Sequence, residues 1–373
     1  MSHQLKLVLV AGARPNFMKV APLIKCIERH NRENPNGGRR ISLCLVHTGQ
    51  HYDAQMSSVF FKELGIPSPD VNLEVGSGSH AVQTANVMTR FEPVCEREKP
   101  DWLVVVGDVN STMACTLVAS KIGIKVAHVE AGLRSFDRTM PEEINRIVTD
   151  SLADLLLTPS EDANANLRRE GVPDAKIRLV GNIMIDALVA NLAKARATPI
   201  RDSLGLDGQP FVYVTLHRPA NVDHQETLKA IMGELEKLAR RVPVVFPMHP
   251  RTRKMLSDYG ITLAASGTLR ILDPIGYHDS LCLTENARMV LTDSGGLQEE
   301  STFFHTPCLT LRPNTERPVT ITHGSNRLTT LATLGRDISE VLGTDKRTDK
   351  TPELWDGCTA GRILRELLAA SNS

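Results

Sequence analysis

Gly123-Ile124-Lys125-Val126-Ala127-His128-Val129, followed by Glu130-Ala131-Gly132-Leu133-Arg134, is the stretch of sequence that decides the fold. Its first seven residues predict a buried strand, and charged residues begin where that strand ends. A second charged run, Pro141-Glu142-Glu143-Ile144-Asn145-Arg146, follows it. Because ligands bind outside the carboxyl ends of strands in an open parallel sheet, the region is a candidate site. The alternative is a solvated loop with surface ion pairs, which contribute little to stability.

The same pattern, an apolar strand followed by turn residues, repeats along the whole chain. In the first half, strands are predicted at 5–10, 41–46, 102–106, 123–129, 155–158 and 177–180. In the second half, they are predicted at 211–216, 244–247, 269–272, 289–291 and 308–311. Helices are predicted between them, for example at 17–30, at 81–96 and behind Ser160, which is expected to cap its helix. Apolar strands that alternate with helices predict an α/β fold with doubly wound parallel sheets.

The length of 373 residues suits two domains, and an apolar content of 41% allows each of them a core. We place the boundary near Gly181, where the first strand series ends. This predicts a first Rossmann-like domain at 1–181 and a second at 182–357. The C-terminal segment 358–373 is expected to be helical and to pack back on the first domain.

Charge and cysteine content limit the partners and the compartment. Lys plus Arg and Asp plus Glu both number 43, so no net charge draws the chain to nucleic acid or to a membrane surface. The seven cysteines include no Cys-x-x-Cys pair and are interpreted as free thiols of a reducing compartment. Lys6 and Arg14-Pro15 interrupt the N-terminal apolar run, and no segment reaches the roughly 18 apolar residues that a membrane span needs. We therefore expect a cytoplasmic protein.

The most specific local signal is Asp293-Ser294-Gly295-Gly296, which lies between a predicted strand and a predicted helix. Two glycines let the backbone approach an oxygen closely, Ser294 offers a hydroxyl, and a helix N-terminus supplies free N–H groups. This combination is typical of a phosphate cradle. Glu300, on the same predicted helix, is suited to accept the hydroxyls of a ribose. The alternative is an ordinary helix cap with structural glycines.

Several cations also lie at predicted strand ends or helix starts. They are Arg14, Lys19, His249, Arg251 and Arg317. Each alone is typical of a solvated surface. Together they predict a local cationic lining in a neutral protein, which suits a diphosphate. A charge-assisted hydrogen bond to such a group contributes about 1.5–3 kcal/mol.

The acidic candidates are Asp108, Glu130 and Glu142, each expected on a loop of the first domain, and His217 ends a strand of the second. Carboxylates that face an anionic ligand repel it unless they transfer protons on another part of it. His217 is suited either to pair with a diphosphate or to act as an acid or base near neutral pH. Metal binding is disfavoured because no Asp, Glu or His triplet has a recognisable ligand spacing.

As an ordered set, these motifs resemble the non-hydrolysing UDP-N-acetylglucosamine 2-epimerases. The resemblance runs from about residue 5 to residue 330. It rests on Gly12-Ala13-Arg14-Pro15 with Lys19, Gly107-Asp108, His128 to Arg134, Pro141 to Arg146, His217-Arg218, Asp293 to Gly296 with Glu300, and Thr315-Glu316-Arg317-Pro318.

The resemblance implies two Rossmann-like domains that face a central cleft, as in GT-B glycosyltransferases, and a homodimer. It also implies interconversion of UDP-GlcNAc and UDP-ManNAc without NAD, other cofactor or metal, by elimination of UDP to 2-acetamidoglucal and re-addition. Asp108, Glu130 and Glu142 would be the acid/base candidates, and His217 would assist near the diphosphate. The residues that would bind UDP are Arg14, Lys19, Arg146, His249, Ile275, Ser294, Gly295, Gly296, Glu300 and Arg317.

This chain departs from the family pattern in two places. Members with a regulatory UDP-GlcNAc site tend to carry Gln-His-Arg-Glu where this chain has Gln50-His51-Tyr52-Asp53, and a second arginine where it has Pro219. The resemblance therefore does not extend to activation by substrate. Ile275 and Ser280 replace larger residues that such enzymes often place near uracil.

Three other functions stay open. A UDP-sugar-dependent glycosyltransferase of the same fold would explain the phosphate cradle but not the carboxylates. A 2-epimerase of a UDP-diacetamido-uronate would need one more cation, which Arg134 or Arg138 would supply. A non-catalytic nucleotide-sugar sensor would leave the acidic residues without a role.

Overall fold

The computed structural model describes residues 4–12, 14–34, 39–49, 65–263, 268–344 and 349–371, apart from the side chains of Arg14 and Pro15. The chain forms two compact units. Unit 1 is Met1–Ala187 with Glu353–Ser373, and unit 2 is Leu188–Pro352. The division falls within helix α7 (Ile183–Arg196), which begins just after the predicted boundary residue Gly181.

Unit 1 is built on one parallel sheet of seven strands in the order β3-β2-β1-β4-β5-β6-β7. The strands are β1 Leu5–Ala11, β2 Ile41–His47, β3 Val71–Asn72, β4 Trp102–Val106, β5 Lys125–Val129, β6 Leu155–Thr158 and β7 Ile177–Leu179. The helices are α1 Arg14–Glu33, α3 His80–Glu98, α4 Asn110–Lys121, α5 Pro141–Leu152, α6 Glu161–Arg169, the short 3₁₀ helix Asp174–Lys176 and α16 Thr359–Ala370.

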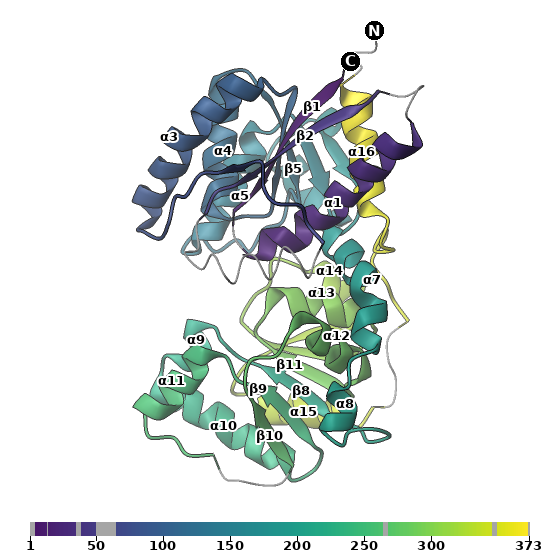
Figure 1. Ribbon diagram of the computed structural model, residues 1–373. Coiled ribbons are helices and arrows are strands. Elements are labelled where there is room, and N and C mark those ends of the chain that lie inside the picture. The colour runs from purple at the N-terminus through teal and green to yellow at the C-terminus, as the bar shows by residue number, and fades with distance from the viewer. Residues whose placement is uncertain are drawn as a thin grey trace. The chain divides into compact units, whose positions relative to one another are not determined.

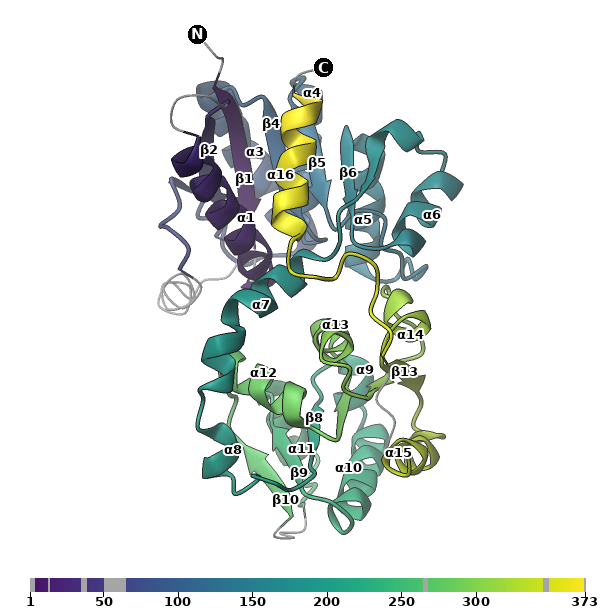
Figure 2. The same ribbon diagram turned by 90° about the vertical axis from the view of Figure 1, so that its right-hand side faces the viewer.

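Helices cover both faces of this sheet. α1 and α16 lie side by side on one face, and α3, α4 and α5 lie on the other (Figures 1 and 2). The core under α3 and α4 is apolar, with Phe91 and Val105 fully buried. α16 is fixed to unit 1 by Asp186, whose carboxylate accepts hydrogen bonds from the backbone N–H groups of Thr359 (3.0 Å) and Ala360 (2.7 Å) at the start of that helix.

Unit 2 is a second doubly wound unit, with six parallel strands in the order β10-β9-β8-β11-β12-β13. The strands are β8 Val212–Thr215, β9 Val244–Pro247, β10 Leu269–Leu272, β11 Met289–Thr292, β12 Cys308–Leu311 and β13 Asn326–Thr329. The helices are α8 Ile200–Ser203, α9 Pro219–Val222, α10 Gln225–Ala239, α11 Pro250–Asp258, α12 Tyr277–Asn286, α13 Gly295–Phe303, α14 Val319–Thr322 and α15 Leu334–Leu342. Side chains of α10 and α15 pack on one face of the sheet, and those of α12 and α13 pack on the other.

The predicted fold class is confirmed, and every predicted strand is present within two residues of its predicted ends. The predictions missed β3 and β13. β13 carries Asn326, Arg327 and Thr329, so it has no apolar run, and it forms a strand because it pairs with β12. The prediction for Ser160 was wrong in part. The residue precedes α6, but its side chain makes no capping hydrogen bond. None of the helices in the described part of the chain is both long and apolar enough to cross a membrane.

Candidate active site

In each unit, several candidate residues lie just after strands at the centre of the sheet. These strands are neighbours at the point where the strand order reverses. In unit 1 the reversal lies between β1 and β4, and β5 is the next strand. Lys19 lies on the helix after β1, Asp108 follows β4, and Glu130 follows β5. In unit 2 the reversal lies between β8 and β11, which are followed by His217 and Ser294. Such a reversal is where open α/β sheets bind their ligands.

Glu130 is buried and forms an ion pair with the buried ammonium of Lys19. Its φ angle of 73° lies in the left-handed region, which a glutamate rarely adopts, and this bends the chain sharply at the end of β5. Gly107 packs against this pair. A Cβ atom on Gly107 would lie 2.7 Å from Nζ of Lys19 and 3.5 Å from Oε2 of Glu130, and its φ is +67°. The positive φ therefore favours glycine here, and a side chain at this position would displace the Lys19 ammonium.

Two residues of α5, Asn145 and Arg146, bind Asp108. Arg146 is buried and joins Asp108 to Glu143, with Nη1 of Arg146 2.9 Å from Oε2 of Glu143. The amide of Asn145 also donates to the backbone carbonyl of Asp108 at 2.9 Å. Arg146 was predicted to hold UDP; here its guanidinium holds the carboxylate of Asp108.

Glu143 stabilises the loop before α5. Its two carboxylate oxygens accept hydrogen bonds from the backbone N–H groups of Ser135 (2.9 Å) and Phe136 (2.9 Å) and from the Ser135 hydroxyl (3.0 Å). This explains how Phe136 keeps a φ of 58° although its side chain is 69% exposed. Glu143 therefore has a structural role, which separates it from its neighbour Glu142.

The prediction that Glu142 lies on a loop was wrong. It lies in the first turn of α5, where Pro141 occupies a position that proline favours because its fixed φ suits a helix start. A carboxylate there is stabilised by the partial positive charge of the helix N-terminus. The Glu142 side chain is exposed, unlike those of Glu130 and Glu143.

In unit 2, the buried carboxylate of Asp293 organises the ends of β8 and β11. It accepts hydrogen bonds from the backbone N–H groups of His217 (3.0 Å) and Arg218 (2.9 Å) and from the amide of Asn221 (3.0 Å). The Nδ1 atom of His217 lies 2.9 Å from Oδ1 of the same carboxylate. Burial alone would raise the pKa of Asp293, but its hydrogen bonds to His217 and Asn221 lower it. Asp293 therefore stays ionised and fixes the orientation of the His217 ring.

The His217 ring is partly open, with 41% of its side chain exposed, and it lies beside the His249 ring at a centroid distance of 5.6 Å. Nδ1 of His249 accepts a hydrogen bond from the backbone N–H of Arg251 at 3.1 Å, at the start of α11. Burial and the nearby His217 lower the pKa of His249. The neutral form, with its proton on Nε2, is therefore favoured. Arg251 itself is exposed and paired with Asp223.

The predicted phosphate cradle has the expected backbone. Ser294 follows β11 in an extended conformation, and Gly295 and Gly296 begin α13. The Ser294 side chain makes no capping hydrogen bond. Arg317 lies next to this turn, because a Cβ on Gly295 would be 3.0 Å from its Nη1. Its guanidinium is bound by Glu299 (Nε–Oε1, 2.6 Å) and Glu316 (Nη1–Oε1, 2.5 Å). The arginine predicted to bind UDP is thus paired with two buried carboxylates, and Arg312 is a second partner of Glu316.

Glu300 is only 7% exposed, on α13 beside Glu299. Burial, with a smaller effect from the charge of Glu299, raises the pKa of Glu300 to about 8. Burial also raises the pKa of Tyr277, with smaller contributions from Glu300 and Glu299. The Tyr277 hydroxyl is buried and has no hydrogen-bond partner among the described residues. Glu300 is therefore largely neutral at pH 7 in the ligand-free protein.

The remaining predicted residues have less to report. Ile275 is half-buried and packs against the apolar residues under α12 and α13. The Arg14 side chain and Gln50-His51-Tyr52-Asp53 lie outside the described residues. Pro219 is the first residue of α9, which gives a local reason for proline at this position. In the part of the chain that is described, no group of three His, Cys, Asp or Glu side chains is arranged to hold a metal ion.

The sequence predictions assigned no role to Asp293, Glu143, Asn145 or Asn16. Asn16 accepts a hydrogen bond from the backbone N–H of Gly12 at 3.2 Å and donates to the carbonyl of Val106 at 2.9 Å, which ties the end of β1 to that of β4. Asp293 had a detectable signal, since it directly follows a buried strand, whereas Asp108 follows its strand after one glycine. Nothing in the sequence distinguished the structural residue Glu143 from its neighbour, the candidate Glu142.

The structure has two doubly wound sheets with charged residues at their strand ends, and the second sheet also has a helix that starts with Ser-Gly-Gly. These features are those of the nucleotide-binding α/β enzymes. The UDP-N-acetylglucosamine 2-epimerase family model matches residues 36–368. The UDP-N-acetylglucosamine 2-epimerase of Methanocaldococcus jannaschii is 42% identical over 373 residues, which cover 97% of this chain and 99% of that protein. The chain therefore belongs to the UDP-N-acetylglucosamine 2-epimerase family, a family of non-hydrolysing isomerases.

Two further comparisons bear on the fold and the substrate. The crystal structure of the M. jannaschii enzyme in complex with UDP-GlcNAc and UDP matches with a TM-score of 0.86 at 41% identity, over 98% of this chain and 100% of that chain. The UDP-2,3-diacetamido-2,3-dideoxy-D-glucuronate 2-epimerase of Pseudomonas aeruginosa is 40% identical over 372 residues, 98% of this chain and 99% of that protein. The resemblance to the UDP-N-acetylglucosamine 2-epimerases is confirmed. The two relatives are named for different UDP-sugar substrates.

Proposed function

We propose that the chain interconverts UDP-N-acetylglucosamine and UDP-N-acetylmannosamine by inverting C2 of the sugar. In the first step the C2 proton moves to a protein base while the C1–O electron pair leaves with UDP, which forms 2-acetamidoglucal. UDP then adds back to C1 as a proton is delivered to the opposite face of C2. The observation that carries the proposal is the presence of Asp108 and Glu130 at the ends of neighbouring strands, each bound to a buried cation.

The proposed roles follow from the chemistry of each group. Asp108, Glu130 and Glu142 transfer protons at C2, and His217, oriented by Asp293, assists the leaving diphosphate. Ser294, Gly295, Gly296 and the N-terminus of α13 bind phosphate oxygens, and Glu300 accepts the ribose hydroxyls. The other residues that we propose to bind UDP are Arg14, Lys19, Arg146, His249, Ile275 and Arg317.

Proton NMR in D₂O tests the reaction, with the purified protein and UDP-N-acetylglucosamine as the only substrate. We expect UDP-N-acetylmannosamine to form and to carry deuterium at C2, because the group that delivers the second proton has exchanged it with the D₂O. Product without deuterium at C2 would contradict C2–H cleavage by an exchanging base. Conversion only after addition of a sugar acceptor would instead identify a glycosyltransferase.

A 2-epimerase of a UDP-diacetamido-uronate is the second candidate, because the P. aeruginosa relative has nearly the same identity to this chain as the M. jannaschii relative. A C6 carboxylate needs an available cation. Arg134 does not supply it: the guanidinium is 2% exposed and bound to Asp150 (2.7 Å) and to both oxygens of Glu170 (2.8 and 2.7 Å). Arg138 is exposed. We expect slower turnover of the uronate than of UDP-N-acetylglucosamine, and the reverse ranking would assign the other substrate.

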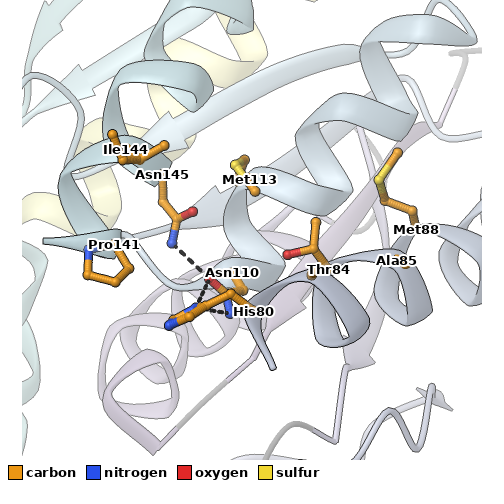
Figure 3. A pocket seen from close by; sticks show the side chains of 10 residues that line it. His80, Thr84, Ala85, Met88, Asn110, Met113, Pro141, Ile144 and Asn145 are labelled. Atoms are coloured by element: carbon orange, nitrogen blue, oxygen red, sulfur yellow. Dashed lines mark hydrogen bonds between the residues drawn. The ribbon is translucent and has the colours of Figure 1, made fainter. Parts of the chain in front are cut away.

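We also propose that the enzyme is a homodimer, which is supported by an apolar pocket of about 450 Å³ between α3, α4 and α5 of unit 1. Figure 3 shows Met88, Met113 and Ile144 around this pocket, with His80, Asn110 and Asn145 joined by hydrogen bonds between Ile144 and Met88. Ile144 is 40% exposed.

Analytical ultracentrifugation tests the dimer. We expect a species of about 82 kDa, twice the chain mass of 41.0 kDa, and expect Ile144→Glu to shift it towards the monomer. The matched control is Ile271→Glu, at an exposed position of the edge strand β10. A wild-type monomer, or equal effects of the two substitutions, would contradict a dimer through this surface.

The cytoplasm is the compartment that we propose. All seven cysteines are free thiols, and Cys358 is exposed, which suits a reducing environment. Burial raises the pKa of Cys44 to about 11 and that of Cys308 to about 11, so these thiols are unreactive at neutral pH. Fractionation of the native cells, with detection of the protein by antibody, tests this expectation.

A further inference from the structure

His128 is fully buried near the end of β5 and is bound on both sides of its ring. Nδ1 lies 2.6 Å from Oδ1 of Asp150, and Nε2 lies 2.8 Å from the backbone carbonyl oxygen of Gly107. A carbonyl oxygen only accepts hydrogen bonds, so Nε2 carries a proton and donates it. Burial alone would raise the pKa of Asp150, but its contacts with His128 and Arg134 lower it, so this carboxylate also accepts. The ring is therefore held at both nitrogens, by Asp150 on one side and by Gly107 on the other.

The carboxylate of Asp150 connects the two loops that carry Asp108 and Glu130. Through His128 it holds the carbonyl of Gly107, the residue before Asp108. Its second oxygen accepts hydrogen bonds from the backbone N–H of Gly132 (3.0 Å), two residues after Glu130, and from Nη1 of Arg134 (2.7 Å). Gly132 itself packs closely against α6 and has no room for a side chain, since a Cβ there would lie 2.5 Å from the carbonyl oxygen of Ala163.

We propose that His128 and Asp150 are positioning residues, which hold the Asp108 loop and the Glu130 loop at a fixed separation. The inference rests on the proposed function. Inversion at C2 needs one group to take the proton from one face and another to return a proton to the other face. A change of about 1 Å in the placement of a reacting group costs on the order of a hundredfold in rate. A rigid link between the two loops therefore increases the rate of the reaction, because it keeps both groups in place.

Loss of this link has a specific consequence for the reaction. Elimination breaks the C2–H and C1–O bonds and leaves UDP and 2-acetamidoglucal in the site. When the second proton donor is misplaced, re-addition slows and the two products leave the enzyme more often. The ratio of glycal released to epimer formed therefore reports the alignment of the two loops. A loss of folded protein lowers glycal release and epimer formation equally and leaves this ratio unchanged.

Two substitutions of His128 separate its two hydrogen bonds. The amide nitrogen of glutamine reaches the place of Nε2 and retains donation to Gly107, whereas that of asparagine reaches the place of Nδ1 and retains donation to Asp150. We expect His128→Asn to lower kcat by about a hundredfold, with a smaller change in KM and more glycal released per turnover. His128→Gln loses the contact to Asp150 but keeps the Gly107 carbonyl bound to β5, two residues before Glu130, so it is expected to lose less than tenfold. Asp150→Asn is expected to release more glycal as well, because it weakens the contacts to both loops.

Glu170→Gln is the matched control. It removes the outer ion pair of Arg134, which lies in the same network, but leaves the contacts of His128 and Asp150 in place. We expect it to lower the unfolding temperature without changing the glycal ratio. The inference is overturned if the folded His128→Asn and Asp150→Asn proteins keep the wild-type ratio and lose activity only in step with their stability. If the wild-type protein forms no UDP-N-acetylmannosamine, the proposed function itself has failed.

Discussion

Glu300→Gln is expected to change the pH dependence of stability of the ligand-free protein. The reason is that Glu300 is buried on α13, where its pKa is raised from 4.5 to about 8. The folded state thus holds the Glu300 proton more tightly than the unfolded state does. Glu300 therefore contributes stability that is fully present below pH 4.5 and is lost as pH rises towards 8.

The size of this effect follows from the two pKa values. Since one pH unit corresponds to about 1.4 kcal/mol, the span from 4.5 to about 8 corresponds to at most about 5 kcal/mol of unfolding free energy. Most of it, about 3–4 kcal/mol, is lost between pH 5 and pH 8. Glutamine does not titrate, so its variant lacks this loss. The variant should gain stability relative to the wild type by that amount over this pH range.

Urea unfolding of both proteins at pH 5, 6, 7 and 8 measures the effect. Far-UV circular dichroism is the suitable signal, because both tryptophans, Trp102 and Trp355, belong to unit 1 and do not report on unit 2. Glu226→Gln, at an exposed position of α10 in the same unit, is the control and should show no such trend. A constant free-energy difference between wild type and Glu300→Gln from pH 5 to pH 8 would refute the reasoning.

Three further predictions concern catalysis, binding and stability. Asp108→Asn and Glu130→Gln are expected to bind UDP but to lose turnover by about 10²–10⁴, measured by NMR and calorimetry; a change in affinity alone would contradict their acid/base role. Ser294→Ala should weaken UDP binding by about tenfold with unchanged unfolding, because it removes one hydroxyl that has no capping role; unchanged affinity in calorimetry would remove Ser294 from the phosphate site. Arg317→Ala should weaken UDP binding and also cost about 3–5 kcal/mol of stability, since it breaks two buried ion pairs, with Glu299 and Glu316, although Glu316 keeps its pair with Arg312; urea unfolding that matches the wild type would contradict these ion pairs.

The sequence was sufficient to predict where most candidate residues lie along the fold. Continuous apolar runs such as Trp102–Val106 are unambiguous signals of buried strands. The charged residue after each run must then lie at the carboxyl end of a strand. Contacts between these residues did not follow, because they depend on the strand order. Lys19 meets Glu130 only because β1, β4 and β5 are consecutive in the sheet. Likewise, nothing in the spacing of Arg134 and Glu170, 36 residues apart, indicates their ion pair.

The pairing of candidate acids with candidate phosphate-binding cations has a consequence for the proposed reaction. Lys19 is bound to Glu130, and Arg146 is bound to Asp108. A carboxylate that takes up the C2 proton becomes neutral and no longer balances the charge of its cation. At the same moment the departing diphosphate gains negative charge. Lys19, released in this way by Glu130, would stabilise that charge, whereas Arg146 keeps its second ion pair with Glu143. In the proposed reaction the Lys19–Glu130 pair would thus couple proton removal to departure of the leaving group.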